Sequence, residues 1–326
     1  MKISVGVAAA IAAWVLAAPG AKAQDDVYPS RAVQVILPLQ AGSASDIAVR
    51  IVGERLAVAL KQGVVIENVP GAAGLIGAER LQRAKPDGYT LAAMNNSILT
   101  ILPNIQRDKV KFDALADFVP IHGLANIPTF LGVYQDFQPN SVKELIAYAK
   151  ARPDDVNFST GGAGSPQHLA TAMFTSMAGI NVTQVPYKGA TQAAAGLAGG
   201  QVQAMFIAHS LALPFLPSGK VRLIAFAGGK RSAAFPDLPT VSEAGLSGFD
   251  YSSWIALLAP KGTPQPVVQR LRAEVARVLA APDLGERMTK SGLELWPVSA
   301  EELPRVIRED DARWKRVVRE AGIKPE

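Results

Sequence analysis

The side chains that could perform catalysis are few in this chain, and they form no known catalytic pattern. None of its three histidines, His122, His168 and His209, belongs to an H-E-x-x-H motif or stands at a metal-ligand spacing from carboxylates. Cysteine is absent, which excludes a thiolate zinc site and a cysteine nucleophile. No G-x-S-x-G nucleophile elbow occurs. The residues alone therefore indicate no recognisable catalytic site, no metal site and no cofactor, and they leave open whether a metal ion assists anion binding.

Two glycine-containing segments approach nucleotide-binding motifs without matching them. Gly229-Lys230 has Ile224 where a phosphate-binding loop requires its upstream glycine. Gly162-x-Gly164 follows a strand-like run, but Gln167 occupies the third glycine position of the dinucleotide fingerprint. No acidic residue follows at a distance of about 20 residues. These mismatches argue against a nucleotide site.

Two loops rich in small residues have the chemistry of an anion-binding site. Each joins an expected strand to an expected helix, so backbone N–H groups can approach a ligand closely. The unpaired N–H groups and the dipole of each following helix favour negative charge, and a carboxylate would accept charge-assisted hydrogen bonds there. Taken alone, each loop is better explained as an ordinary strand–helix connection, and only the two together, with a basic segment, favour an anion site. The candidate ligand-binding residues of the two loops are Leu39, Gln40, Ala41, Gly42, Ser43, Gly162, Ala163, Gly164 and Ser165.

Three further side chains stand near expected strand or helix ends and are candidates for the walls of the site. Asn95 follows a strand, Tyr187 precedes Lys188-Gly189, and His168 lies one turn inside a helix. Each also has a structural alternative: His168 could be an ordinary core or helix-surface histidine, and Tyr187 could belong to a solvated turn.

The charge distribution adds weight to an anionic ligand. Residues 156–236 contain no Asp or Glu, but they contain Lys188, Lys220, Arg222, Lys230 and Arg231. A positive cleft would favour an anion, although an Ala- and Gly-rich scaffold without surface acids would give the same pattern. The net charge of +5 is mild and only 6% of residues are aromatic, which argues against a nucleic-acid partner.

The candidate loops require a framework of alternating strands and helices. With 326 residues, of which 49% are hydrophobic, the chain is long enough for two domains with substantial cores. Alternating strands and helices predict an α/β fold with mostly parallel sheets, in which ligands bind at the carboxyl ends of strands. We expect strands at Ala32–Pro38, Val64–Asn68, Thr90–Ala93, Val156–Thr160, Val221–Ala227 and Trp254–Ala259. We expect helices over Ser45–Lys61 and Pro166–Ala178, and helices beginning near Ser141, Pro264 and Ser299, the last ending near Gly322.

The first 23 residues have the pattern of a signal peptide. Lys2 precedes an uncharged run, Ile3–Ala18, which Pro19-Gly20 ends. Ala21-Lys22-Ala23 then matches the small-x-small pattern of a cleavage site. We expect residues 1–23 to be removed and the remainder to be a periplasmic protein. A retained membrane anchor is the alternative.

The chain resembles the extracytoplasmic solute receptors of tripartite tricarboxylate transporters. The resemblance covers essentially the whole chain after residue 23, and its motifs are specific in their order and spacing. They are Glu67-Asn68-x-Pro70-Gly71-Ala72, Gly77-Ala78-Glu79, Pro86-Asp87-Gly88-Tyr89-Thr90, Gln167-His168-Leu169, Val185-Pro186-Tyr187-Lys188-Gly189, Leu238-Pro239-Thr240, Glu243-Ala244-Gly245 and Gly262-Thr263-Pro264.

The resemblance implies a two-lobed periplasmic binding protein of type II-like fold, with a ligand cleft between the lobes and no catalysis. It implies a first lobe of residues 24–124 plus 229–326 and a second lobe of residues 125–228. It also implies that backbone groups and ordered water of the two loops hold a carboxylate, with His168 nearby. We expect a monomer that takes a small organic carboxylate to membrane permease subunits.

Two positions depart from the family pattern. Many relatives have Gly-Gly where this chain has Gly42-Ser43, and many have Asp where it has Ile207. Loss of that acid suggests a ligand whose far end is less polar than citrate, such as an aromatic or aliphatic carboxylate, dicarboxylates included.

Two other functions stay open at the level of sequence. A sensory binding protein of the same fold would present its ligand to a membrane kinase, and the sequence does not separate it from a transport receptor. A hydrolase or lyase would use Ser165 and His168, but it lacks a nearby acid to orient the histidine.

Overall fold

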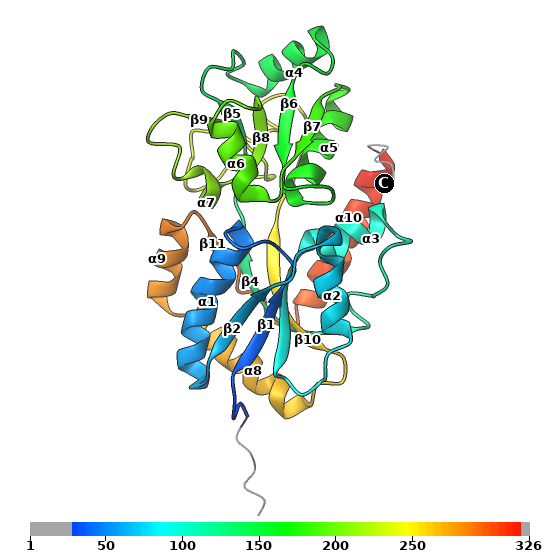
Figure 1. The fold of residues 1–326 in the computed structure, drawn as a ribbon, viewed down its shortest axis with the longest axis vertical. Coiled ribbons are helices and arrows are strands. Elements are labelled where there is room, and N and C mark those ends of the chain that lie inside the picture. Colours follow the sequence, from blue (N-terminus) through cyan, green and yellow to red (C-terminus); the bar gives the residue numbers. More distant parts are fainter. Residues whose placement is uncertain (1–27, 321–326) are drawn as a thin grey trace, which may run out of the picture.

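The computed structural model describes residues 28–320, which form two lobes stacked along the long axis (Figure 1). The expected signal peptide and the expected helix end near Gly322 lie outside the described residues. Within residues 28–320, no helix combines the length and the apolar character needed to cross a membrane.

The first lobe contains a six-stranded sheet in the order β11-β4-β10-β3-β1-β2. Its strands are β1 (Val33–Leu37), β2 (Val64–Asn68), β3 (Thr90–Asn95), β4 (Phe118–Asn126), β10 (Trp254–Pro260) and β11 (Glu294–Leu295). The second lobe contains a five-stranded sheet in the order β7-β6-β8-β5-β9. Its strands are β5 (Thr129–Tyr134), β6 (Asn157–Thr160), β7 (Thr183–Pro186), β8 (Ala204–Ala208) and β9 (Val221–Phe226).

Most strands of each sheet run in one direction, as predicted. In the first sheet β1, β2, β3 and β4 share a direction, and β10 and β11 oppose it. In the second sheet only β5 opposes the others. Because β10 and β5 lie inside their sheets, each forms two antiparallel pairs. The pairing is therefore mixed, although the strand directions are mostly parallel.

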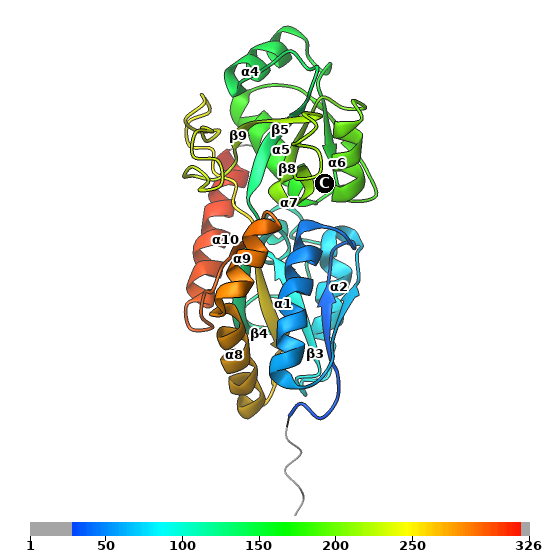
Figure 2. The same ribbon diagram turned by 90° about the vertical axis from the view of Figure 1, so that its left-hand side faces the viewer.

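Helices cover both faces of the first sheet (Figure 2). Strand β1 shows why, because Val33, Val35 and Leu37 join one hydrophobic cluster while Ile36 joins another. The first cluster includes side chains of α1 (Ala44–Leu60), α8 (Gln265–Leu279) and α9 (Pro282–Lys290). The second includes side chains of α2 (Leu75–Gln82), α10 (Leu303–Glu320) and the π-helical turn Ser97–Ile101. A short 3-10 turn at Ala72–Gly74 and α3 (Leu102–Ile105) complete this side.

The second sheet is covered in the same way. On β8, Phe206 packs with α4 (Val142–Ala151) and α5 (Pro166–Ala178). Met205 and Ile207 face the opposite side, toward α6 (Ala190–Ala198) and α7 (His209–Ala212). The alternation along this one strand determines which side chains can reach a ligand.

Helix caps predicted from the sequence are present. The hydroxyl of Ser141 accepts the N–H of Glu144, and Ser165 caps α5 with Pro166 at its first position. Gly179 ends α5 in the left-handed conformation that glycine adopts without strain. Ser299 accepts the N–H of Glu302 just before α10.

The segment between β9 and β10 packs on the second sheet. Thr240 forms a bridge with Phe226, and the ring of Phe249 stacks on Phe206 at 5.6 Å. Tyr251 N–H donates to the carbonyl of Ala227. The lobe boundary near residue 228 stays a prediction, and these contacts favour a boundary closer to residue 252.

Candidate ligand-binding site

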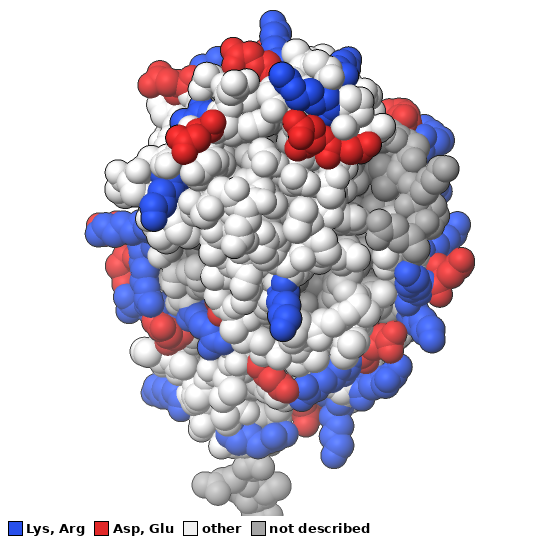
Figure 3. All heavy atoms as spheres, turned by 45° about the horizontal axis from the view of Figure 1, so that its top comes forward, with Lys and Arg blue, Asp and Glu red and all other residues white. Residues whose placement is uncertain are grey.

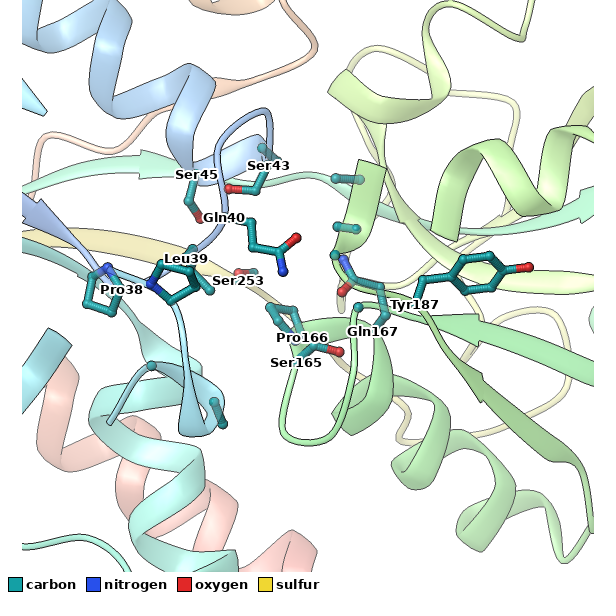
Figure 4. Close-up of a pocket in the computed structure, with 18 of the residues that line it drawn as sticks. Pro38, Leu39, Gln40, Ser43, Ser45, Ser165, Pro166, Gln167, Tyr187 and Ser253 are labelled. Atoms are coloured by element: carbon teal, nitrogen blue, oxygen red, sulfur yellow. The ribbon is translucent and has the colours of Figure 1, made fainter. Parts of the chain in front are cut away.

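A cavity of about 330 Å³ lies between the two lobes (Figure 4). The first lobe contributes Pro38, Leu39, Gln40, Ser43, Ala44, Ser45 and the loop Pro70–Gly74. The second lobe contributes Thr129, Gly161, Ala163, Ser165, Pro166, Gln167, Tyr187, Lys188, Gly189, Ala190, Phe206 and Ala208. Ile127 and Ser253 line it where the chain passes between the sheets. The volume is in the lower range of small-molecule sites.

Three helices begin at the wall of this cavity. Ser43 is the N-cap of α1, Ser165 is the N-cap of α5 and Gly189 is the N-cap of α6, and all three line the cavity. The first N–H groups of a helix have no acceptor within the helix, and the helix dipole makes that end positive. Helix N-termini favour bound anions in general, so three of them at one cavity favour a negatively charged ligand.

A buried network holds the first loop in place. Asp46 accepts the N–H of Gly42 at 2.9 Å, the guanidinium of Arg50 at 3.0 Å and the amide of Asn68 at 2.9 Å. The same Asn68 amide donates to the carbonyl of Leu39. Burial raises the pKa of Asp46, but these hydrogen bonds together outweigh it and hold the pKa below its usual range. Asp46 therefore acts as a charged anchor for the loop that lines the cavity.

The second loop is held by its own helix. Ser165 Oγ accepts the backbone N–H of His168 at 3.3 Å, and His168 Nδ1 accepts the N–H of Gly164 at 3.2 Å. These two side chains shape the loop, which is not the arrangement of a nucleophile and its base. His168 does not line the cavity.

Two amide side chains point into the space between the lobes, Gln40 from the first and Gln167 from the second (Figure 4). The end of the Gln40 side chain lies against Gly189, so closely that a Cβ atom on Gly189 would overlap its Oε1. Glycine is therefore required at 189 for Gln40 to occupy this position.

The two lobes touch each other at both sides of the cavity. Thr191 Oγ1, in α6, donates to the carbonyl of Gly42 at 3.0 Å. Gly164 packs on Ala73 so tightly that a Cβ atom at 164 would overlap the Ala73 methyl group. In the described conformation the two lobes are therefore in direct contact beside the cavity.

Charge around the cavity is positive but sparse. Among the described residues that line it, none is acidic and the single cation is Lys188, which is exposed. Arg222 donates to the carbonyls of Gln135 and Phe137, and Arg231 pairs with Glu243, so these cations serve other contacts. The absence of Asp and Glu from residues 156–236 therefore matters mainly because it leaves this side of the cavity without negative charge. Figure 3 shows a face that is largely uncharged in its central part, with one Lys or Arg side chain near the middle and the other charged side chains mostly around the margin.

The structure brings only part of the predicted site together. Leu39, Gln40, Ser43, Ala163, Ser165 and Tyr187 line the cavity. Ala41, Gly42, Gly162 and Gly164 belong to the same loops but do not line it. The Tyr187 hydroxyl donates to Gln201 and points away from the cavity (Figure 4).

Asn95 and Ile207 lie outside the cavity, which corrects the interpretation placed on them. Asn95 is buried at the end of β3, where its Oδ1 accepts the N–H of Ile98. Ile207 is fully buried on the far face of β8, against Gly132, whereas its neighbours Phe206 and Ala208 face the cavity. Because Ile207 does not line the cavity, its identity gives no information about the polarity of the ligand.

The largest omission from the predicted site is the loop Pro70–Gly74. Its residues Gly71, Ala72, Ala73 and Gly74 all have positive φ angles, of 129°, 45°, 57° and 99°. Two consecutive alanines in this conformation carry strain, which is found at ligand sites. The signal available in the sequence was Gly71 and Gly74 directly after a strand end, the same pattern that marked the other two loops.

Comparison with known proteins agrees with this geometry. Residues 48–323 match the family described as tripartite tricarboxylate transporter family receptor. Protein BugT of Bordetella pertussis is 32% identical over 92% of this chain and 92% of its own length. The structure of R. palustris Rpa4515 with adipate is 32% identical, with a TM-score of 0.86, over 92% of this chain and 100% of that chain. MatC (Rpa3494) from Rhodopseudomonas palustris with bound malate is 32% identical, with a TM-score of 0.83, over 89% of this chain and 100% of that chain.

The structure of periplasmic binding protein BugD is also similar, at 33% identity and a TM-score of 0.85 over 92% of this chain and 100% of that chain. The matched family and these structures are receptors and binding proteins. This chain is therefore a binding protein rather than an enzyme, and it belongs to the tripartite tricarboxylate transporter receptor family.

Proposed function

We propose that this protein is a periplasmic receptor that binds a small organic carboxylate and delivers it to a membrane permease. The observation that carries the proposal is the convergence of three helix N-termini, at Ser43, Ser165 and Gly189, on a cavity without an acidic wall residue. Backbone N–H groups at such ends bind a carboxylate with charge-assisted hydrogen bonds.

The wall composition supports an organic acid over an inorganic anion. Leu39, Ile127, Phe206 and Ala208 add apolar surface to the polar groups of the loops. A ligand with a carboxylate and a short carbon skeleton satisfies both kinds of surface. The adipate and malate in the structures of two relatives belong to this class. A micromolar dissociation constant corresponds to about −8 kcal/mol, which a few such hydrogen bonds together with apolar burial can supply.

Delivery to a permease requires that the ligand control the shape of the receptor. The cavity walls come from both lobes, so a bound ligand bridges them and favours the closed form. The contacts Thr191–Gly42 and Gly164–Ala73 join the lobes in that form. A permease that distinguishes closed from open receptor would thereby respond to the ligand.

The test is a thermal-unfolding screen of the chain from Gln24 onward against mono-, di- and tricarboxylates, after refolding from denaturant to remove any copurified ligand. A ligand at about 100 times its dissociation constant should stabilise the protein by about 2.7 kcal/mol. A saturable rise in the unfolding temperature with one carboxylate class is the expected result. A screen in which no carboxylate raises that temperature would refute the proposal.

A further inference from the structure

A surface groove separate from the ligand cavity lies between α10 and the segment that comprises α3 and the residues after it. Helices α3 and α10 lie side by side in the first lobe (Figure 1). The groove has a volume of about 560 Å³, and none of its lining residues lines the ligand cavity. Its apolar lining consists of Pro103, Val110, Phe112 and Val318. Apolar side chains in a concave surface suit a partner that inserts apolar groups of its own.

The polar part of this groove is mostly positive. Arg107, Lys315 and Arg319 line it, and Asp311 is the single acid among its lining residues in the described chain. Asp311 Oδ1 accepts the side-chain amide of Asn104 at 2.7 Å, a hydrogen bond that joins the two walls. The one negative charge is therefore already engaged within the groove.

Two of the three cations have no partner within residues 28–320. Arg107 and Lys315 are exposed, and neither forms a hydrogen bond or an ion pair with a described residue. Arg319 lies 3.7 Å from its neighbour Glu320, and such an exposed pair contributes little. The groove therefore presents positive charge beside apolar surface, which complements an acidic partner.

Both walls of the groove also reach the second lobe. Ile105 of α3 and Trp314 of α10 belong to the hydrophobic cluster that contains Phe206 of β8. The ring of Trp314 lies edge-on to that of Tyr251, with centroids 5.9 Å apart. About two turns earlier in α10, Ile307 belongs instead to a cluster of the first sheet. Helix α10 thus extends from the first lobe to the second (Figure 2), and a partner in the groove would sit at their junction.

We propose that this groove is a docking site for an acidic peptide segment of the membrane permease. Apolar side chains of that segment lie against Phe112 and Val318, and its carboxylates face Arg107 and Lys315. A bilayer surface is too broad to enter a groove between two chain segments, so a peptide fits better than a membrane. This inference rests on the proposed function, because it names the surface through which the same receptor would meet its permease.

The first test separates docking from ligand binding. The double variant Arg107→Glu/Lys315→Glu reverses two exposed, unpaired charges, so its unfolding temperature and its adipate affinity in isothermal titration should match the wild type. Uptake of labelled adipate by cells that have the permease and this variant as their receptor should fall at least about fivefold. Lys85→Glu/Lys150→Glu, which reverses two exposed charges outside the groove, is the matched control and should keep wild-type uptake.

A second test measures the groove directly and needs no ligand. A short fluorescent peptide of alternating glutamate and leucine should bind the wild type in anisotropy titrations at low salt. Its lysine–leucine counterpart should not bind. The double variant Arg107→Glu/Lys315→Glu should bind the acidic peptide at least about fivefold more weakly, and Lys85→Glu/Lys150→Glu should bind it normally.

Three results would overturn the docking site. One is an acidic peptide that binds the double variant as well as the wild type or binds neither. Another is binding to phosphatidylglycerol vesicles, but not to the peptide, that the double variant loses. The third is self-association in sedimentation that the double variant abolishes, because a second copy would then occupy the groove. Unchanged uptake by the double variant refutes the docking site alone, whereas a wild type that binds no carboxylate refutes the proposed function.

Discussion

Replacing Gly164 with alanine should test whether the contact between Gly164 and Ala73 limits closure of the two lobes. Gly164 has a φ of 71°, and a Cβ atom there would overlap the Ala73 methyl group and lie 3.3 Å from Leu102 Cδ2. Both neighbours belong to the first lobe, so the clash exists only when the lobes are closed. The added methyl group should therefore weaken ligand binding more than it destabilises the unliganded protein.

The size of the effect follows from the two separate costs of the substitution. Left-handed strain at a non-glycine residue costs about 1 kcal/mol in the open and the closed form alike. Overpacking a tight contact costs about 1–3 kcal/mol more, and here it applies to the closed form alone. The dissociation constant of Gly164→Ala should rise about five- to 150-fold.

Gly219→Ala is the matched control, because Gly219 has a φ of 70° and a Cβ atom added there would meet no other heavy atom within 4 Å. It should lose similar stability and keep wild-type affinity for the carboxylate, measured by isothermal titration. Adding Ala73→Gly to Gly164→Ala should restore affinity, as in a double-mutant cycle. Equal affinity losses in Gly164→Ala and Gly219→Ala, with no rescue by Ala73→Gly, would show that the contact between Gly164 and Ala73 does not control closure of the lobes.

Three further predictions concern single interactions. Thr191→Val removes the hydrogen bond to Gly42 across the cleft, so the dissociation constant should rise about two- to fivefold in titration, while Thr191→Ser should bind normally. Asp46→Asn weakens the anchor of the first loop and should lower the unfolding free energy at neutral pH by about 1–2 kcal/mol. Because the pKa of Asp46 is lowered in the fold, that difference should shrink as acid protonates the wild-type carboxylate; an unchanged difference at low pH would contradict the assignment. Burial lowers the pKa of His209. The unfolded chain therefore gains a proton below about pH 6.5 before the folded chain does, and wild-type stability should fall as the pH decreases. Chemical denaturation of His209→Phe across this pH range should show a shallower fall in stability.

The sequence was most informative where local chemistry decides the structure. Ser165-Pro166 and Gly179 define both ends of α5 through capping and left-handed geometry, which depend on neighbouring residues alone. The apolar run at β1 likewise predicts a strand, and the apolar stripe of α1 predicts a helix. Because both loops of the predicted site lie between such elements, their position at strand ends could be inferred before the structure was known.

Features that depend on tertiary contacts were not accessible in this way. The side chain of Ile207 faces away from the cavity because β8 alternates, and the sequence of a strand buried on both faces does not show which side a residue occupies. Tyr187 directs its hydroxyl to Gln201 and packs against Gly196 of α6, the helix that follows it in the chain, and the sequence does not show this orientation. Strands β4, β5, β7, β8 and β11 were not among the expected strands. Pro120, His122 and Gly123 interrupt the apolar pattern of β4, whereas β5 and β8 are apolar runs that their composition alone could have indicated.

Recognition by three helix N-termini in an acid-free cavity requires that the ligand carry negative charge. Isothermal titration of ligand-free protein with adipate and, in parallel, with its dimethyl ester examines this requirement, because the ester keeps the carbon skeleton and removes both charges. We expect saturable binding of adipate, with the ester at least about tenfold weaker, because charge-assisted hydrogen bonds to the helix N-termini are lost. Equal affinity for acid and ester would contradict the proposed function, because the helix N-termini would then contribute nothing to recognition.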